Sequence, residues 1–114
     1  MSDGDLRREV AARFGGFLER RGFSEIGYSY NRMMFGNEIL DLSDEDDVSI
    51  RFVRDRSQVF ADLRKSGTDY VPSHLLFARL GVDSSEHASL DKQGFLEPLA
   101  RDLMLYWDRL IALL

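Results

Sequence analysis

The chain has 114 residues, 44% hydrophobic and 31% charged, with a formal net charge of −5. This composition is typical of one globular domain, here residues 1–114, and excludes a disordered chain. The lack of cysteine excludes disulfides, thiol catalysis and sulfur-ligated metal centres. An acidic, polar start and the lack of an apolar run of ~20 residues predict a soluble, cytoplasmic protein without signal peptide or membrane span.

The acidic balance also bears on the choice of partner. A nucleic-acid surface usually shows a basic excess, whereas this chain has 15 basic and 20 acidic residues. The sequence therefore predicts no nucleic-acid partner. An acidic protein is suited to a basic protein partner, and mild acidity also serves solubility alone.

The first expected element is a helix over residues 6–21. Its apolar stripe has helical spacing and consists of Leu6, Val10, Phe14, Phe17 and Leu18. The Gly15-Gly16 pair lowers helix propensity, and we expect it to allow close packing of a strand. Gly22 predicts the helix end, after which Phe23 packs back on the helix.

Four consecutive strands are expected next, over residues 25–35, 38–42, 48–54 and 57–63. Apolar and polar residues alternate along them, which predicts an antiparallel meander with one face on the core. We expect Ile26 to share a face with Tyr28. If residues 42 and 48 pair across the intervening loop, Leu40 lies opposite Ile50 and both share the apolar face.

Two helices close the chain, one over residues 72–80 and a long one from about 90 or 95 to 113. Pro98 fits only in or near the first turn of the long helix. The predicted class is α+β. Its architecture is an antiparallel meander of three to four strands, packed on one face by an N-terminal and a long C-terminal helix, in the order α-β-β-β-(β)-α-α.

The residues that could perform chemistry are few and scattered. His74 and His87 lie thirteen residues apart, not at the three- or four-residue spacing of two ligands on one helix face. We expect His74 in the first turn of a helix and His87 in a solvated loop. The chain has no nucleophile elbow, P-loop or dinucleotide motif. The sequence predicts a protein without catalytic residues, cofactor or metal.

The strongest positive feature is an acidic segment around the second strand. It fails the EF-hand pattern, because the sixth residue from Asp41 is Asp46 instead of glycine. A solvated hairpin loop, weak cation binding and a partner-binding ridge are the alternatives. Arg51 is expected to pair with Glu38 or Asp41. The candidate partner-binding residues are Glu38, Asp41, Asp44, Glu45, Asp46, Asp47 and Trp107.

Two short segments support a resemblance at the level of layout. They are Arg20-Arg21-Gly22-Phe23 after the first helix and Val48-Ser49-Ile50-Arg51-Phe52 in the sheet. With the order of elements, they make the chain resemble small bacterial α+β proteins, including immunity proteins of polymorphic toxin systems. The resemblance implies an acidic inhibitor that binds a toxin, often a basic nuclease.

Two other hypotheses stay open. One is a small acidic secretion chaperone or adaptor that forms a homodimer through residues 107–114. The other is an enzyme that uses scattered carboxylates.

Overall fold

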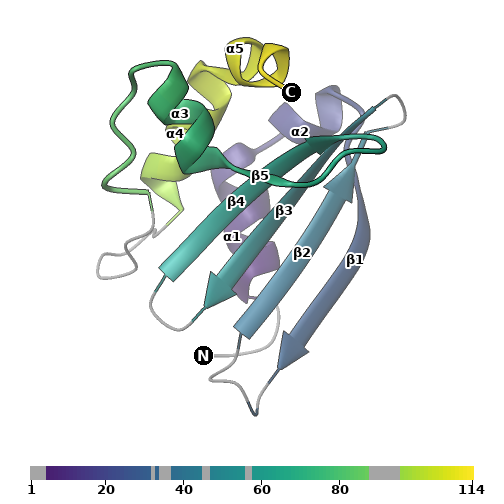
Figure 1. The fold of residues 1–114 in the computed structure, drawn as a ribbon. Coiled ribbons are helices and arrows are strands. Elements are labelled where there is room, and N and C mark those ends of the chain that lie inside the picture. Colours follow the sequence, from purple (N-terminus) through teal and green to yellow (C-terminus); the bar gives the residue numbers. More distant parts are fainter. Residues whose placement is uncertain (1–4, 32, 34–36, 45–46, 56–57, 88–95) are drawn as a thin grey trace.

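The computed structural model describes residues 5–31, 33, 37–44, 47–55, 58–87 and 96–114. Its centre is one five-stranded antiparallel sheet in the order β1-β2-β3-β4-β5 (Figure 1). The strands are β1 (Ser24–Asn31), β2 (Asn37–Ser43), β3 (Val48–Asp55), β4 (Gln58–Lys65) and β5 (Val71–Pro72). The predicted α+β meander is confirmed, with β5 as a short addition at the β4 edge.

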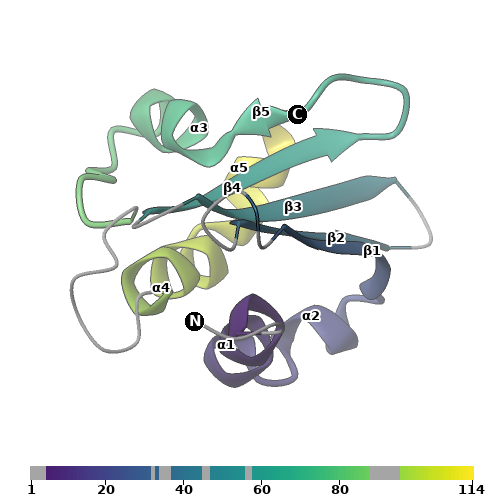
Figure 2. The same ribbon diagram turned by 90° about the horizontal axis from the view of Figure 1, so that it is seen from below.

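The helices are α1 (Asp5–Phe14), α2 (Phe17–Arg20), α3 (Ser73–Arg79), α4 (Glu97–Leu105) and α5 (Trp107–Ala112). Figure 2 shows α1, α2 and α4 together on one face of the sheet, while α3 lies apart from them at the β4 edge. Over β1, β2 and β3, none of the described helices covers the opposite face. None of the described helices is long and apolar enough to cross a membrane.

The hydrophobic core lies between the sheet and this helical layer. Strand alternation places every second side chain in it. The strands contribute Leu40, Leu42, Val48, Ile50, Phe52, Val59, Ala61 and Leu63 to the core, and the helices contribute Leu6, Val10, Phe14, Leu18, Leu76, Phe77, Leu99, Leu103, Trp107 and Leu110. A domain of this size obtains most of its stability from such apolar burial.

The N-terminal helix is interrupted because Gly15 has a φ of +55°, a left-handed conformation that ends α1. A Cβ at Gly15 would meet nothing within 4 Å, so the expectation that these glycines admit a close strand is not confirmed at Gly15. Gly22, with φ +83°, ends α2 as predicted. The Phe23 N–H donates to the Leu18 carbonyl at 3.0 Å, and Phe23 packs into the core.

The C-terminal helix is also split, with Tyr106 between α4 and α5. Pro98 occupies the first turn of α4, as predicted. The predicted helix starts at residue 90 or 95 lie outside the described residues. His74 lies in the first turn of α3, and Gly81 follows that helix with a φ of +74°.

The β2–β3 hairpin differs from the predicted register by two residues. Leu42 lies opposite Ile50, and Asp41 lies opposite Arg51. The turn falls one residue later because the Asp44 carboxylate accepts the N–H groups of Asp47 and Val48, both at 2.8 Å. A two-residue shift keeps every side chain on its predicted face, so the apolar face was predicted correctly.

The start of β1 departs from simple alternation. The pairing of β1 with β2 shifts between Glu25 and Gly27, so Ile26 stands in a bulge and is exposed. The prediction that Ile26 shares the face of Tyr28 is therefore wrong. Tyr28 is half-buried and packs against the core.

Candidate functional site

Glu38 does not belong to an exposed acidic ridge. Its exposed fraction is 0%, and its carboxylate forms a 2.5 Å ion pair with the buried guanidinium of Arg54. The same carboxylate accepts the Tyr28 hydroxyl at 2.6 Å and the Leu6 N–H at 3.2 and 3.3 Å. Because Leu6 lies in the first turn of α1, this carboxylate satisfies a free N–H at the positive end of that helix. Glu38 joins α1 to the sheet and is not available to a partner.

The other acidic candidates are mostly engaged in local structure. Asp41 accepts a two-pronged contact from Arg51 at 2.7 and 3.2 Å, which confirms one of the two predicted pairings. Asp44 closes the hairpin turn, and the exposed Asp47 accepts the Ser66 N–H at 3.3 Å. Glu45 and Asp46 lie outside the described residues. The structure therefore does not bring the described members of this set together as one free acidic surface.

Trp107 is buried and contacts Phe17 and Phe23, each with ring centroids 5.6 Å apart. It fixes α5 against α2 and cannot serve as an exposed contact residue. The hypothesis of a homodimer through residues 107–114 thereby loses its aromatic anchor. Tyr106 is half-buried against Phe77, with ring centroids 6.2 Å apart.

An apolar row crosses the uncovered face of the sheet. Ile39 on β2 lies opposite Val53 on β3, which lies opposite Phe60 on β4. Ile39 and Phe60 are each 36% exposed. The next row on this face consists of Asp41, Arg51 and Asp62, again in cross-strand register. Large apolar side chains beside charged ones on an uncovered face are typical of an interaction surface.

Asp62 is the acidic residue of this face that is best placed for a partner. It forms no ion pair with any residue that the structure describes. Burial raises the pKa of Asp62 above its usual range, although the positive charges of Arg51 and His74 act to lower it. A cationic group from a partner would stabilise this carboxylate in its charged form.

A cavity of about 340 Å³ opens beside this row, at the edge of β4. The β4 residues that line the cavity include some that face the core and some that face the opposite side of the sheet. The cavity therefore lies along the edge of β4, next to the part of the strand that does not pair with the short β5. Its lining is mainly apolar and consists of Val53, Val59, Phe60, Ala61, Pro72 and Leu99, with Asp62, Ser73, His74, Ser84 and His87 as polar members. The volume lies at the small end of the range of ligand sites.

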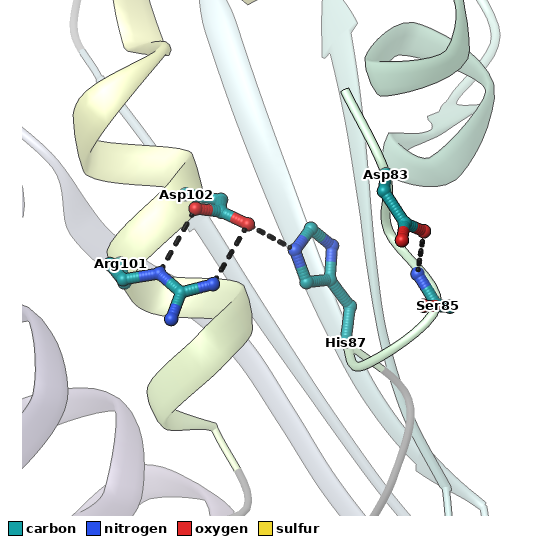
Figure 3. A network of polar contacts seen from close by, with 5 residues as sticks. All are labelled: Asp83, Ser85, His87, Arg101 and Asp102. Atoms are coloured by element: carbon teal, nitrogen blue, oxygen red, sulfur yellow. Dashed lines mark hydrogen bonds and ion pairs between the residues drawn. The ribbon is translucent and has the colours of Figure 1, made fainter. Parts of the chain in front are cut away.

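The sequence led us to expect His87 in a solvated loop, but the structure shows it buried. It is 6% exposed, and its Nε2 lies 2.7 Å from the Asp102 carboxylate (Figure 3). Arg101 donates to the same carboxylate at 3.1 and 3.3 Å. Phe77 packs edge-on against the imidazole, with ring centroids 4.9 Å apart. The ring is thus fixed from two sides.

The charge of the Asp102 carboxylate decides whether Nε2 of His87 carries a proton. Burial acts to raise the pKa of Asp102, but hydrogen bonds from Arg101 and His87 outweigh burial, so that pKa lies below its usual range. An ionised carboxylate only accepts hydrogen bonds, so the Nε2 of His87 carries a proton. Nδ1 lies on the ring edge turned away from Asp102 (Figure 3). It is buried and has no hydrogen-bond partner among the described residues.

This arrangement offers a fixed imidazole beside a small apolar cavity. Ser73 and Ser84 line the cavity, yet neither hydroxyl bonds to Nδ1, so the described residues contain no serine activated by His87. No group of three or more potential metal ligands occurs within the described parts of the chain.

Sequence reasoning missed both buried pairs, for different reasons. Glu38 lies two residues from Leu40 on β2, and Arg54 lies two residues from Phe52 on β3. Strand alternation alone therefore places both charged residues on the core face. No comparable pattern in the sequence predicts that His87 meets Asp102. The two residues lie 15 positions apart, and the sequence around His87 has neither strand nor helix periodicity.

No protein-family model, curated protein or solved structure matches the chain in the comparisons. The resemblance to immunity proteins is therefore still a prediction.

Proposed function

We propose that the protein is a non-catalytic binding module whose uncovered sheet face docks on a basic partner protein. The observation that supports this most is the apolar row of Ile39, Val53 and Phe60 on a face without a helical cover. Large apolar side chains that lie together on an uncovered face often mark a binding surface. The row is short, so it would form the centre of a modest interface with a charged rim.

The charges favour a basic partner. The chain has a net charge of −5, which steers cationic proteins towards it. Beside the apolar row, Arg51 is already engaged by Asp41, whereas Asp62 has no ion-pair partner among the described residues. A partner segment with an apolar residue followed by a Lys or Arg would contact Phe60 and Asp62 together.

The most concrete form of this proposal is an immunity or antitoxin protein that acts in the cytoplasm and inhibits a cognate toxin. Net acidity, the layout resemblance and the uncovered face support it. An inhibitor needs a rigid surface that excludes the toxin's substrate, and a sheet buttressed by helices on its other face provides one.

The test is co-expression with a toxin encoded beside this gene, with growth rescue and calorimetric Kd as the readouts. Phe60→Asp should weaken binding by at least about tenfold, since it removes a central apolar contact of roughly 1.4 kcal/mol or more. The matched control is Leu105→Asp, which changes a 70% exposed leucine on α4. Binding unaffected by Phe60→Asp would refute docking through the sheet face. Absence of both rescue and binding would refute the immunity function.

A further inference from the structure

We propose that the cavity at the β4 edge binds a small organic ammonium ion, whose cationic group contacts the Asp62 carboxylate and whose apolar body fills the remaining space. The site shares Phe60 and Asp62 with the proposed docking face, but it needs no protein partner and does not rest on that proposal. Three observations support it: the state of the Asp62 carboxylate, the charge of the cavity lining, and the size and polarity of the cavity.

Asp62 is a carboxylate at the cavity with its charge unmatched by a close cation. Strand alternation places its side chain on the uncovered face, on the same side as Phe60, and the residue is partly exposed. Arg51, its cross-strand neighbour, is bonded to Asp41 instead. Burial raises the pKa of Asp62 against the opposing charges of Arg51 and His74. A cation bound at this carboxylate would offset the burial.

The charge of the lining favours a cation over an anion. Among the lining residues that the structure describes, Asp62 is the one acidic residue, and neither lysine nor arginine occurs. Of the two histidines in the lining, His87 is already engaged by Asp102 at 2.7 Å. An ammonium ion that enters the cavity therefore meets a carboxylate without having to displace a lysine or arginine from it.

The small number of oxygen ligands selects an organic cation over a metal ion. Calcium takes about six to eight oxygen ligands, and magnesium requires a nearly octahedral set. The described lining offers one carboxylate and the hydroxyl groups of Ser73 and Ser84. One ammonium group makes up to three hydrogen bonds, which such a set can accept.

The remaining walls suit a small apolar body attached to the ammonium group. Val53, Phe60 and Pro72 line the cavity together with Val59 and other core residues. The volume of about 340 Å³ lies at the small end of the range of ligand sites, which matches a compound with a single ring. Burial of that ring against apolar walls stabilises the complex.

The experiment is an NMR titration of the full chain with benzylamine, and with benzyl alcohol as a neutral probe of nearly the same shape. At about pH 8, carboxylates and alkylammonium groups are charged whereas imidazoles are mostly neutral. Benzylammonium should shift the amide resonances of Phe60, Asp62 and Ser73. Asp62→Asn should weaken its binding by about 3- to 10-fold, an effect between those of an exposed ion pair and a charged hydrogen bond. Binding of benzyl alcohol should not change.

The matched control is Asp55→Asn, which removes the same charge from the exposed end of β3, outside the described cavity lining. It should leave the Kd of benzylammonium nearly unchanged. Equal losses in the two variants, or cavity amides that do not shift, overturn the proposal. If Asp62→Asn fails to fold, the wild-type protein in about 1 M NaCl decides. Salt should weaken benzylammonium binding at the cavity amides and spare benzyl alcohol, and an equal response of both probes overturns the proposal.

Discussion

Two buried pairs of polar side chains among the described residues differ in how fully their polar atoms are hydrogen-bonded. In the Glu38–Arg54 pair under α1, the carboxylate also accepts the Tyr28 hydroxyl and the Leu6 N–H. In the His87–Asp102 pair at the β4 edge, one ring nitrogen has no partner among the described residues and a cavity lies beside it. The first pair joins two elements of the fold, whereas the second leaves one buried ring nitrogen without a partner in the described part of the chain.

The difference shows that burial of charge alone does not indicate a functional site. Buried pairs need further hydrogen bonds to offset the loss of hydration, and the pair under α1 obtains them from the chain itself. What distinguishes His87 is the combination of a fixed ring, an unsatisfied nitrogen and adjacent space.

The largest expected effect is that of Glu38→Gln. This change removes the negative charge that Glu38 supplies to the buried guanidinium of Arg54 and should lower the free energy of unfolding by about 3–5 kcal/mol. Chemical denaturation monitored by circular dichroism measures it. Glu9→Gln is the control, because Glu9 forms a more exposed pair with Arg13 on the same helix. Equal losses in the two variants would show that the pair under α1 does not anchor that helix.

Asp102→Asn should have the next largest effect. Removal of a charged hydrogen-bond acceptor from both His87 and Arg101 should lower the free energy of unfolding by about 1.5–3 kcal/mol at neutral pH. The exposed Asp108 provides the control, and Asp108→Asn should cost less than about 1 kcal/mol. A loss no greater than that of the control would contradict the structural role of Asp102.

The loss of stability in Asp102→Asn should also depend on pH. Burial opposes ionisation of Asp102, but Arg101 and His87 lower its pKa below the usual value of 3.8. A lowered pKa in the folded state stabilises the fold above the unfolded-state value, and this contribution is lost as pH falls through the folded pKa. The stability gap between wild type and Asp102→Asn should therefore be full at neutral pH and close below about pH 4. A gap that widens on acidification would show the opposite sign.

The smallest effect belongs to the pair on the uncovered sheet face. Asp41→Asn removes a partly exposed pair with Arg51 and should lower the free energy of unfolding by about 0.2–1 kcal/mol. Because solvent reaches this pair, the loss should shrink further in 1 M NaCl. A loss as large as that of Glu38→Gln would mean that exposure does not separate the two kinds of pair.

Much of this fold could be predicted because strand alternation and helix caps are local signals. The spacing of Leu40, Leu42, Ile50 and Phe52 predicted the apolar face even where the hairpin register was wrong by two residues. The helix end at Gly22 could be predicted because glycine readily adopts the left-handed conformation that ends a helix, and Gly22 has this conformation. The break at Gly15 was missed because the Gly15-Gly16 pair was interpreted as a local loss of helix propensity within a continuous apolar stripe, not as a helix end.

The site was less predictable because its residues meet only through tertiary packing. Nothing near His87 in the sequence indicates that Phe77 will cover its ring or that Asp102 will bind its nitrogen. Conversely, the acidic segment looked like a surface because its charges are adjacent in sequence. Alternation turns Glu38 into the core, while Asp44 is used by the turn.

The imidazole ¹⁵N spectrum of the wild-type protein at neutral pH tests the contrast between the two pairs most directly. The structure predicts that Nε2 of His87 carries a proton that is hydrogen-bonded to Asp102, and that the Nε2 resonance shifts in Asp102→Asn. An Nε2 without a proton would contradict the account, because an ionised Asp102 carboxylate can only accept a hydrogen bond.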